Sequence, residues 1–147
     1  MAFRLQIATP ERLLVRADAE EAQIPGRCGY LGILPEHAPL ISELKPGEIS
    51  YRQGGRTERL AVSWGFVEVL PQRVTVLAQT AEKAEEIDVP RAEAARHRAQ
   101  ERLRHADPDT DINRARGSLE RALARIQVAG KSGAVNPSTK IPFDRAL

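Results

Sequence analysis

The sequence predicts an α+β, mainly β protein, in which an N-terminal antiparallel β-sandwich is followed by a C-terminal antiparallel two-helix hairpin. Residues 1–84 contain short stretches in which every second residue is apolar, separated by turns that contain glycine or proline. From residue 85 to 130, alanine and arginine dominate, and the apolar residues follow at steps of three and four. We therefore divide the chain into a sandwich at 1–84, a helical hairpin at 85–130 and a flexible tail at 131–147.

The first predicted strand has the clearest alternation, because Phe3, Leu5 and Ile7 are apolar whereas Arg4 and Gln6 are polar. The same period recurs in residues 49–51, 60–62, 67–69 and 74–78. Turns are predicted at four dipeptides, Pro25-Gly26, Pro46-Gly47, Gly54-Gly55 and Pro71-Gln72. Short strands joined by such turns are typical of a sandwich or a flattened barrel rather than of a parallel sheet.

Two helices are predicted after this region. Asp88 is a suitable N-cap for the first, and Pro90 is tolerated in its first turn. Asp107-Pro108 ends that helix and starts the second. One apolar face is formed by Ala92, Ala95, Ala99, Leu103 and Ala106, and the other by Ile112, Ala115, Leu119, Ala122 and Ile126. Because the break between the two faces is short, we expect the helices to pack as an antiparallel hairpin.

The composition of the first apolar face predicts a loosely held hairpin. Most of its residues are alanines, and each buried CH₂ group contributes only about 0.8 kcal/mol. A helix with this face packs closely but detaches at low cost, as a moving element requires.

The remaining composition argues against catalysis. Cys28 is the only cysteine, so it has neither a disulfide partner nor a second thiol for a metal site. The three histidines are His37, His97 and His105, and they are best explained as solvated side chains. Residues 1–10 lack the apolar core of a signal peptide, and no stretch approaches the length of a membrane span. We expect a soluble, cytoplasmic, non-catalytic protein that needs no metal.

Residues 29–40, Gly-Tyr-Leu-Gly-Ile-Leu-Pro-Glu-His-Ala-Pro-Leu, form an unusually specific string. Lys45-Pro46-Gly47, residues 65–69 and residues 74–78 follow it in a fixed order, and the helical hairpin completes the pattern. This series resembles the epsilon subunit of bacterial F-type ATP synthases over residues 3–129. Glu36 stands where glycine is commoner in that family, and Gln79 stands where aspartate is commoner.

The resemblance implies a fold and a role. In the family, the sandwich docks on the gamma subunit and on the c-ring as part of the rotating central stalk. The docking surface would include Tyr30, Leu31 and His37, although some relatives carry an acidic residue at the position of Tyr30. The hairpin would fold against the sandwich or extend into the alpha/beta catalytic head, where it inhibits ATP hydrolysis. The protein would be peripheral, at the cytoplasmic face of the bacterial plasma membrane, with no direct membrane insertion.

Residues 87–92, Ile-Asp-Val-Pro-Arg-Ala, match a motif with which some bacterial relatives bind ATP in the folded hairpin. The resemblance implies that ATP, with or without magnesium, is a regulatory ligand rather than a required cofactor. By the same resemblance, the nucleotide-binding residues would be Glu82, Asp88, Arg91, Ala92, Arg98, Arg121 and Arg125.

The second helix is strongly basic. Residues 112–131 hold four arginines and Lys131 against Glu120 alone, which gives five minus one, or +4. In the family, an acidic segment of the beta subunit meets this helix, so the resemblance implies contact through Arg114, Arg116, Arg121 and Arg125. Complementary charge would orient such a contact, and salt would weaken it. A solvated basic face explains the same arginines without a partner.

Two other classes of function compete with this interpretation. A nucleic-acid-binding module would use the arginine-rich helices, but it needs aromatic platforms or a larger positive excess, and residues 85–130 contain no aromatic residue. A ligand-binding sandwich would need clustered aromatic residues, whereas Tyr51 and Trp64 are the only large aromatic residues with a polar tip between Leu40 and the hairpin. We therefore expect no nucleic-acid partner.

Overall fold

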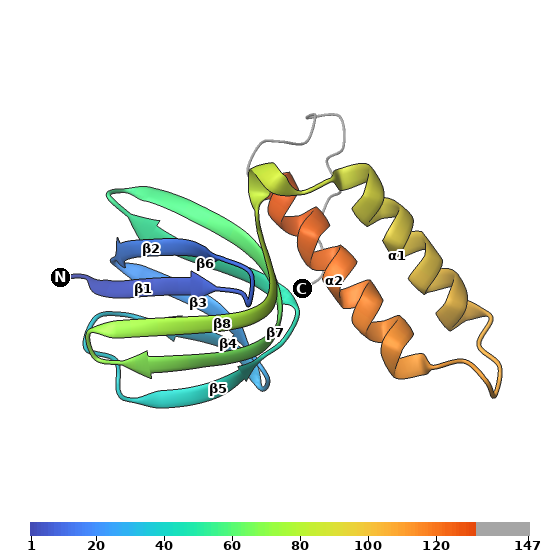
Figure 1. Ribbon diagram of the computed structural model, residues 1–147, viewed down its shortest axis with the longest axis horizontal. Helices are drawn as coiled ribbons and strands as arrows, with labels where there is room; N and C mark the ends of the chain where they lie inside the picture. The colour runs from blue at the N-terminus through green and yellow to red at the C-terminus, as the bar shows by residue number, and fades with distance from the viewer. Residues whose placement is uncertain (132–147) are drawn as a thin grey trace, which may run out of the picture.

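The computed structural model describes residues 1–131, which form eight strands, a 3₁₀ turn and two α-helices (Figure 1). The strands are β1 (Phe3–Ala8), β2 (Leu13–Ala19), β3 (Glu21–Gly26), β4 (Gly29–Ile33), β5 (Leu40–Leu44), β6 (Gly47–Gln53), β7 (Arg56–Leu70) and β8 (Arg73–Lys83). The helical elements are η1 (Ala84–Glu86), α1 (Val89–Arg104) and α2 (Ile112–Lys131). Residue 131, expected in the tail, is the last residue of α2. The flexible tail expected at 132–147 lies outside the described residues.

The strands form two layers that share the long strand β7. In one layer the order is β2-β1-β8-β7-β5, and in the other β6, β3 and β4 are neighbours. The first half of β7 pairs with β6 and its second half pairs with β5, so β7 passes from one layer to the other. The predicted mainly β sandwich is confirmed. It is not wholly antiparallel, however, since β1 pairs with β8 in parallel.

β7 bends between its two halves at Trp64 and Gly65. Both residues have positive φ, 51° and 125° respectively. A Cβ on Gly65 would collide with the carbonyl oxygen of Leu77 on β8, so only glycine fits this position. The bend lies at the end of the sandwich that faces the helices (Figure 1), and it therefore shapes the surface that receives α2.

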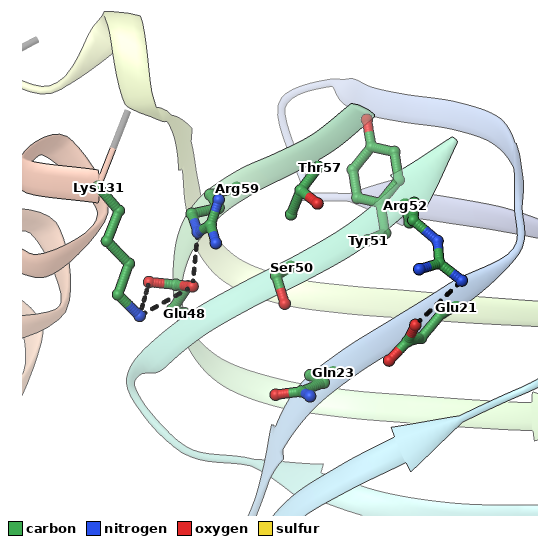
Figure 2. A pocket seen from close by; sticks show the side chains of 9 residues that line it. All are labelled: Glu21, Gln23, Glu48, Ser50, Tyr51, Arg52, Thr57, Arg59 and Lys131. Carbon is green, nitrogen blue, oxygen red and sulfur yellow. Dashed lines mark hydrogen bonds and ion pairs between the residues drawn. The ribbon is translucent and has the colours of Figure 1, made fainter. Parts of the chain in front are cut away.

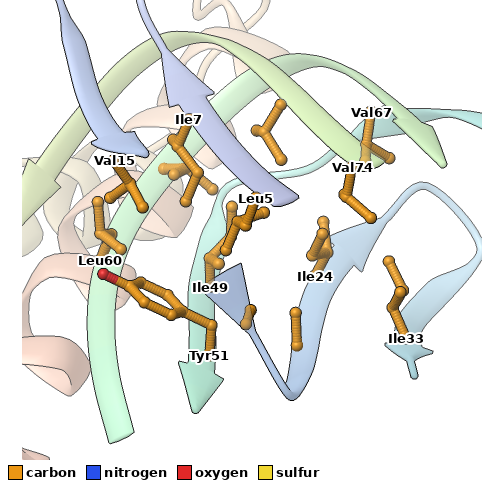
Figure 3. Packing of buried hydrophobic residues seen from close by; sticks show 14 of the residues in the cluster. Leu5, Ile7, Val15, Ile24, Ile33, Ile49, Tyr51, Leu60, Val67 and Val74 are labelled. Atoms are coloured by element: carbon orange, nitrogen blue, oxygen red, sulfur yellow. The ribbon is translucent and has the colours of Figure 1, made fainter. Parts of the chain in front are cut away.

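The core lies between the two layers. Figure 3 shows Leu5 and Val74 from one layer directed toward Ile24 and Ile49 from the other, and all four side chains are fully buried. Leu5 and Val74 belong to alternating stretches whose polar neighbours face outward. In the stretches where the sequence alternates, the apolar positions are therefore the ones that face the core.

The turns agree with the sequence prediction in three of four places. Gly54-Gly55 and Pro71-Gln72 connect their strands as predicted, and Pro46 lies in the link before β6. Pro25-Gly26 is an incorrect prediction, because both residues belong to β3 and the turn is formed by Arg27 and Cys28. Proline is tolerated here because Pro25 is close to the end of its strand.

The hairpin has the predicted antiparallel arrangement. The Asp88 carboxylate accepts a hydrogen bond from the backbone N–H of Arg91 at 3.1 Å, which confirms Asp88 as the N-cap of α1. Four alanines of the two predicted faces are buried: Ala92, Ala99, Ala115 and Ala122. Ala95 is only half-buried, and Ala106 lies exposed in the connection because α1 ends at Arg104.

Candidate functional site

The most informative site is the surface on which α2 lies against the sandwich. α2 contacts β6 and β7 and also packs along α1, so it lies between the sandwich and α1 (Figure 1). The apolar part of this contact is small, and Ile87 packs at its edge. Its buried members are Ala61, Ala84, Ala124 and Val128. Three alanines and one valine bury little apolar surface, so this contact alone holds α2 weakly.

Two groups of charged side chains join α2 to the sandwich. Near the middle of the contact, Nε and Nη2 of Arg125 both lie 2.9 Å from one carboxylate oxygen of Glu82. At the end of α2, Lys131 Nζ lies 3.2 Å from Glu48 Oε2, and Arg59 donates from Nε to Glu48 Oε1 at 3.2 Å (Figure 2). Glu48 is only 6% exposed although it is charged. Both carboxylates belong to the sandwich, and both receive a cation from α2.

The segment that leads into the hairpin is tied to the sandwich independently of α2. Both carboxylate oxygens of Glu86 accept hydrogen bonds from Arg12, at 2.7 and 2.8 Å, and Oε2 also accepts one from the backbone N–H of Lys83. The Arg12 guanidinium, followed by the Lys83 N–H, lowers the pKa of Glu86 from 4.5 to about 2. The chain is therefore held to the sandwich up to Glu86, and a hinge for the hairpin would begin after it.

The structure brings together only part of the proposed nucleotide site. Glu82 and Arg125 form the ion pair described above, and Arg121 and Arg125 line one hollow with residues of β7 and β8. Asp88, Arg91 and Ala92 belong to the start of α1. Because α1 and α2 are antiparallel, Arg91 lies level with the part of α2 that carries Arg121 and Arg125.

Arg98 lies exposed about two turns further along α1, and Ala92 is buried. The hollow beside Arg121 and Arg125 has a volume of about 10 Å³, which holds one water molecule at most. A nucleotide therefore fits these residues only as a surface ligand whose phosphates lie over the arginines, and it does not fit inside the hollow. Within residues 1–131 no three His, Cys, Asp or Glu side chains are grouped as metal ligands.

The three residues proposed for docking lie along β4 and the loop that follows it. Tyr30 is 56% exposed, yet its hydroxyl accepts a hydrogen bond from the backbone N–H of Glu48 at 3.1 Å. Leu31 packs partly against the core. Nδ1 of His37 lies 2.7 Å from the carbonyl oxygen of Ala38. Tyr30 lies near the start of β4, whereas His37 lies in the loop after the end of that strand, so the three residues do not form one patch.

The basic residues of α2 divide between two surroundings. Arg114 and Arg116 are exposed to solvent. Arg121 is half-buried and donates to Ser118, and Arg125 is paired with Glu82. In this arrangement only the first two are available to a partner, because the sandwich already binds Arg125.

Sequence reasoning missed several residues of this surface. Gly117 is buried in α2, and a Cβ added to it would lie 3.6 Å from the ring of Trp64. Glu48 and Arg59 appear in the sequence as ordinary polar strand residues. The only signal was the presence of Gly117, Ala124 and Val128 on a second face of α2, which indicates a helix that packs on both sides.

Neither helix among the described residues combines the length and the apolar composition that crossing a membrane requires.

Comparisons with known proteins agree on one family. Residues 2–84 match the family model "ATP synthase, Delta/Epsilon chain, beta-sandwich domain", and residues 85–130 match its "long alpha-helix domain". An ATP synthase epsilon chain of Moorella thermoacetica is 50% identical over 130 residues, which cover 88% of this chain and 97% of that protein. One from Koribacter versatilis is 57% identical over 107 residues, covering 73% of this chain and 75% of that protein.

The fold also matches a chain in the structure of the Euglena gracilis mitochondrial ATP synthase, OSCP/F1/c-ring. That match has a TM-score of 0.74 and 20% identity, and it covers 91% of this chain and 82% of the other. A structural likeness at this identity supports the fold alone. The family models and the bacterial relatives, in contrast, match this chain in sequence. The chain therefore belongs to the epsilon subunits of F-type ATP synthases, in the bacterial branch that its relatives represent.

Proposed function

We propose that this chain is a central-stalk subunit that links the gamma subunit to the c-ring and regulates ATP hydrolysis through its hairpin. Epsilon subunits are non-catalytic members of the ATP synthase. Similar folds occur in assemblies described as OSCP/F1/c-ring and as central stalk/c-ring, and these names support the proposed partners.

The observation that carries the regulatory part is how the hairpin is attached. Three alanines, one valine and two groups of ion pairs hold α2 to the sandwich, and α1 packs mainly on α2. A contact of this composition allows the hairpin to leave as a unit while the sandwich stays folded. Once it has left, Arg121 and Arg125 join Arg114 and Arg116 as available cations, and together they suit the acidic partner proposed in the alpha/beta head.

The docking part of the proposal uses the end of the sandwich opposite the helices. There the loop 34–39, which contains His37, lies beside the β7–β8 turn, because the backbone N–H of Glu36 donates to the carbonyl oxygen of Pro71 at 2.8 Å (Figure 1). This end stays accessible whether the hairpin is folded or extended, so a rotor contact made there through His37 would not compete with the regulatory movement.

A deletion in the assembled ATP synthase tests the regulatory proposal. Removing residues 88–147 leaves Glu86 and its Arg12 contact in place, and it should raise the rate of ATP hydrolysis several-fold. Removing only 132–147 keeps both helices and serves as the control, which should retain inhibition. A hydrolysis rate unchanged by the longer deletion would contradict an inhibitory hairpin.

ATP is proposed as the ligand that favours the folded hairpin. It would contact arginines of both helices at once, so it would bind the folded form better than the extended one. Isothermal titration calorimetry of the full chain with ATP, with and without magnesium, should detect binding. Arg98→Gln should weaken it, whereas Arg102→Gln, an exposed arginine outside the motif, should not. An absence of heat at millimolar ATP would refute the site.

A further inference from the structure

We propose that Glu48 is the docking residue for the C-terminal end of α2, and that its ion pair with Lys131 controls how often the hairpin leaves the sandwich. The inference rests on the proposed movement of the hairpin and assigns part of its regulation to residues outside the nucleotide motif. The cluster that carries it consists of Glu48, Arg59 and Lys131 and is called the Glu48 cluster below.

The Glu48 carboxylate lies in an unusual position for a charged group. Its side chain is 7% exposed, and the two cations that reach it come from different elements. Arg59 Nε lies 3.2 Å from Oε1, and Lys131 Nζ lies 3.2 Å from Oε2 and 3.4 Å from Oε1. Among the described residues, Oε2 accepts no hydrogen bond, and Lys131 is its ion-pair partner. Lys131 thus completes the pairing of a buried carboxylate.

The two cations would behave differently when the hairpin moves. Arg59 lies on β7, next to β6, and therefore stays with Glu48 in the folded sandwich. Lys131 is the last residue of α2 and leaves with the hairpin. A buried carboxylate that loses one of its partners is destabilised until water reaches it. The Glu48 cluster therefore favours the folded hairpin by an amount that depends on the lysine.

The acceptor is fixed in place, whereas the donor is mobile. The backbone N–H of Glu48 donates to the Tyr30 hydroxyl, and the carboxylate is held by Arg59. Lys131 is 46% exposed and lies at a helix end. Val128, one turn earlier, is fully buried against the sandwich. Loss of the lysine contact would free the last turn of α2 first, and Val128 would be the next residue to separate.

The full chain in solution provides the test. Lys131→Gln and Glu48→Gln each remove one charge of the pair, and the double variant completes a mutant cycle. Lys45→Gln is the matched control, because Lys45 is exposed and has no ion pair among the described residues. Hydrogen exchange of α2 amides measures opening, and the emission of Trp64, the only tryptophan, reports separation from Gly117.

We expect Lys131→Gln to increase the open fraction about fivefold, the upper end of what a partly exposed ion pair supplies. The double variant should open no more than the single ones, and Lys45→Gln should match the wild type. Equal opening in Lys131→Gln and the wild type would overturn the role of Glu48 but leave the moving hairpin intact. Exchange of α2 only through global unfolding in every variant would overturn the moving hairpin as well.

Discussion

The contact between Gly117 and Trp64 gives a sharp prediction about how α2 docks. A Cβ at position 117 would lie 3.5 Å from Nη1 of Arg121 and 3.6 Å from Cζ2 of Trp64, which are ordinary contact distances. Gly117→Ala should therefore fit without displacement. Replacing a helical glycine by alanine stabilises a helix by roughly 0.5–1 kcal/mol. The new methyl group adds about 0.8 kcal/mol of apolar burial.

Only the second contribution distinguishes the docked from the released hairpin, since α2 is helical in both. About 0.8 kcal/mol corresponds to a shift of roughly fourfold toward the docked form. Gly117→Leu should instead shift the equilibrium toward the released hairpin. A Cβ at this position already contacts Arg121 and Trp64, so the remaining leucine carbons would be crowded against them. Overpacking of this kind costs about 1–3 kcal/mol, which is enough to move α2 away from Trp64.

Quenching of Trp64 fluorescence by iodide measures the effect directly, since the chain has one tryptophan and it is 37% exposed. Quenching should fall in Gly117→Ala and rise in Gly117→Leu. Gly130→Ala is the matched control, because it lies in α2 and a Cβ there would meet nothing within 4 Å. Equal quenching in the alanine variants at 117 and 130, or wild-type quenching in Gly117→Leu, would refute the docking geometry.

Three further predictions concern the fold and the hinge. Gly65→Ala should destabilise the sandwich by about 3 kcal/mol or more, as urea unfolding would show, because the new methyl group collides with the Leu77 carbonyl at a positive φ. Lowering the pH should weaken the Arg12–Glu86 attachment: the folded pKa of Glu86, about 2, is below its ordinary value of 4.5, so the stabilisation is complete above pH 4.5 and is lost as pH falls toward 2. Solvent screening keeps this contribution small because both side chains are partly exposed, and Glu86→Gln should abolish the pH dependence in thermal unfolding followed between pH 2 and 5. Asp88→Ala should destabilise the start of α1 by about 1 kcal/mol, seen as faster hydrogen exchange in its first turn, whereas unchanged exchange would contradict the cap.

Local signals were sufficient for most of the fold. The alternation at Phe3, Leu5 and Ile7 identifies a buried face because side chains of a strand point to opposite sides in turn. The spacing of Ala92 and Ala99 identifies the inner face of α1 for the analogous helical reason. Both patterns depend only on neighbours in the sequence, so one chain is enough to find them.

The parts that sequence reasoning missed depend on residues far apart in the chain. Glu48 and Lys131 are 83 positions apart, and Glu82 and Arg125 are 43 apart. No periodicity reports such a pairing. The bend at Trp64 and Gly65 was also missed, although the buried positions change phase there, from Leu60 and Val62 to Val67 and Val69. No local pattern reports that β7 changes its partner from β6 to β5 at the same place. The parallel pairing of β1 with β8 brings together the two ends of the sandwich sequence, which no local pattern encodes.

The candidate site was predicted unevenly for the same reason. The Asp88 cap is a local motif and was found, whereas the use of Arg125 by the sandwich depends on tertiary packing. As a result, Arg121 and Arg125, proposed from the family resemblance both for nucleotide and for the beta subunit, lie on the sandwich side of α2 in the folded form. If both proposed roles hold, they would belong to different positions of the hairpin.

The most direct test of the account is the distance between the sandwich and α2 in the assembled ATP synthase. Cys28 is the chain's only cysteine and is exposed, and Arg114→Cys places a second label on an exposed position of α2. Double electron–electron resonance measures the distance between spin labels at these two sites, provided that the other subunits of the complex contain no cysteine. We expect one short distance for the isolated chain. In the complex we expect a second, longer distance, and we expect its population to fall when ATP is added. A single short distance under all conditions would contradict a hairpin that leaves the sandwich.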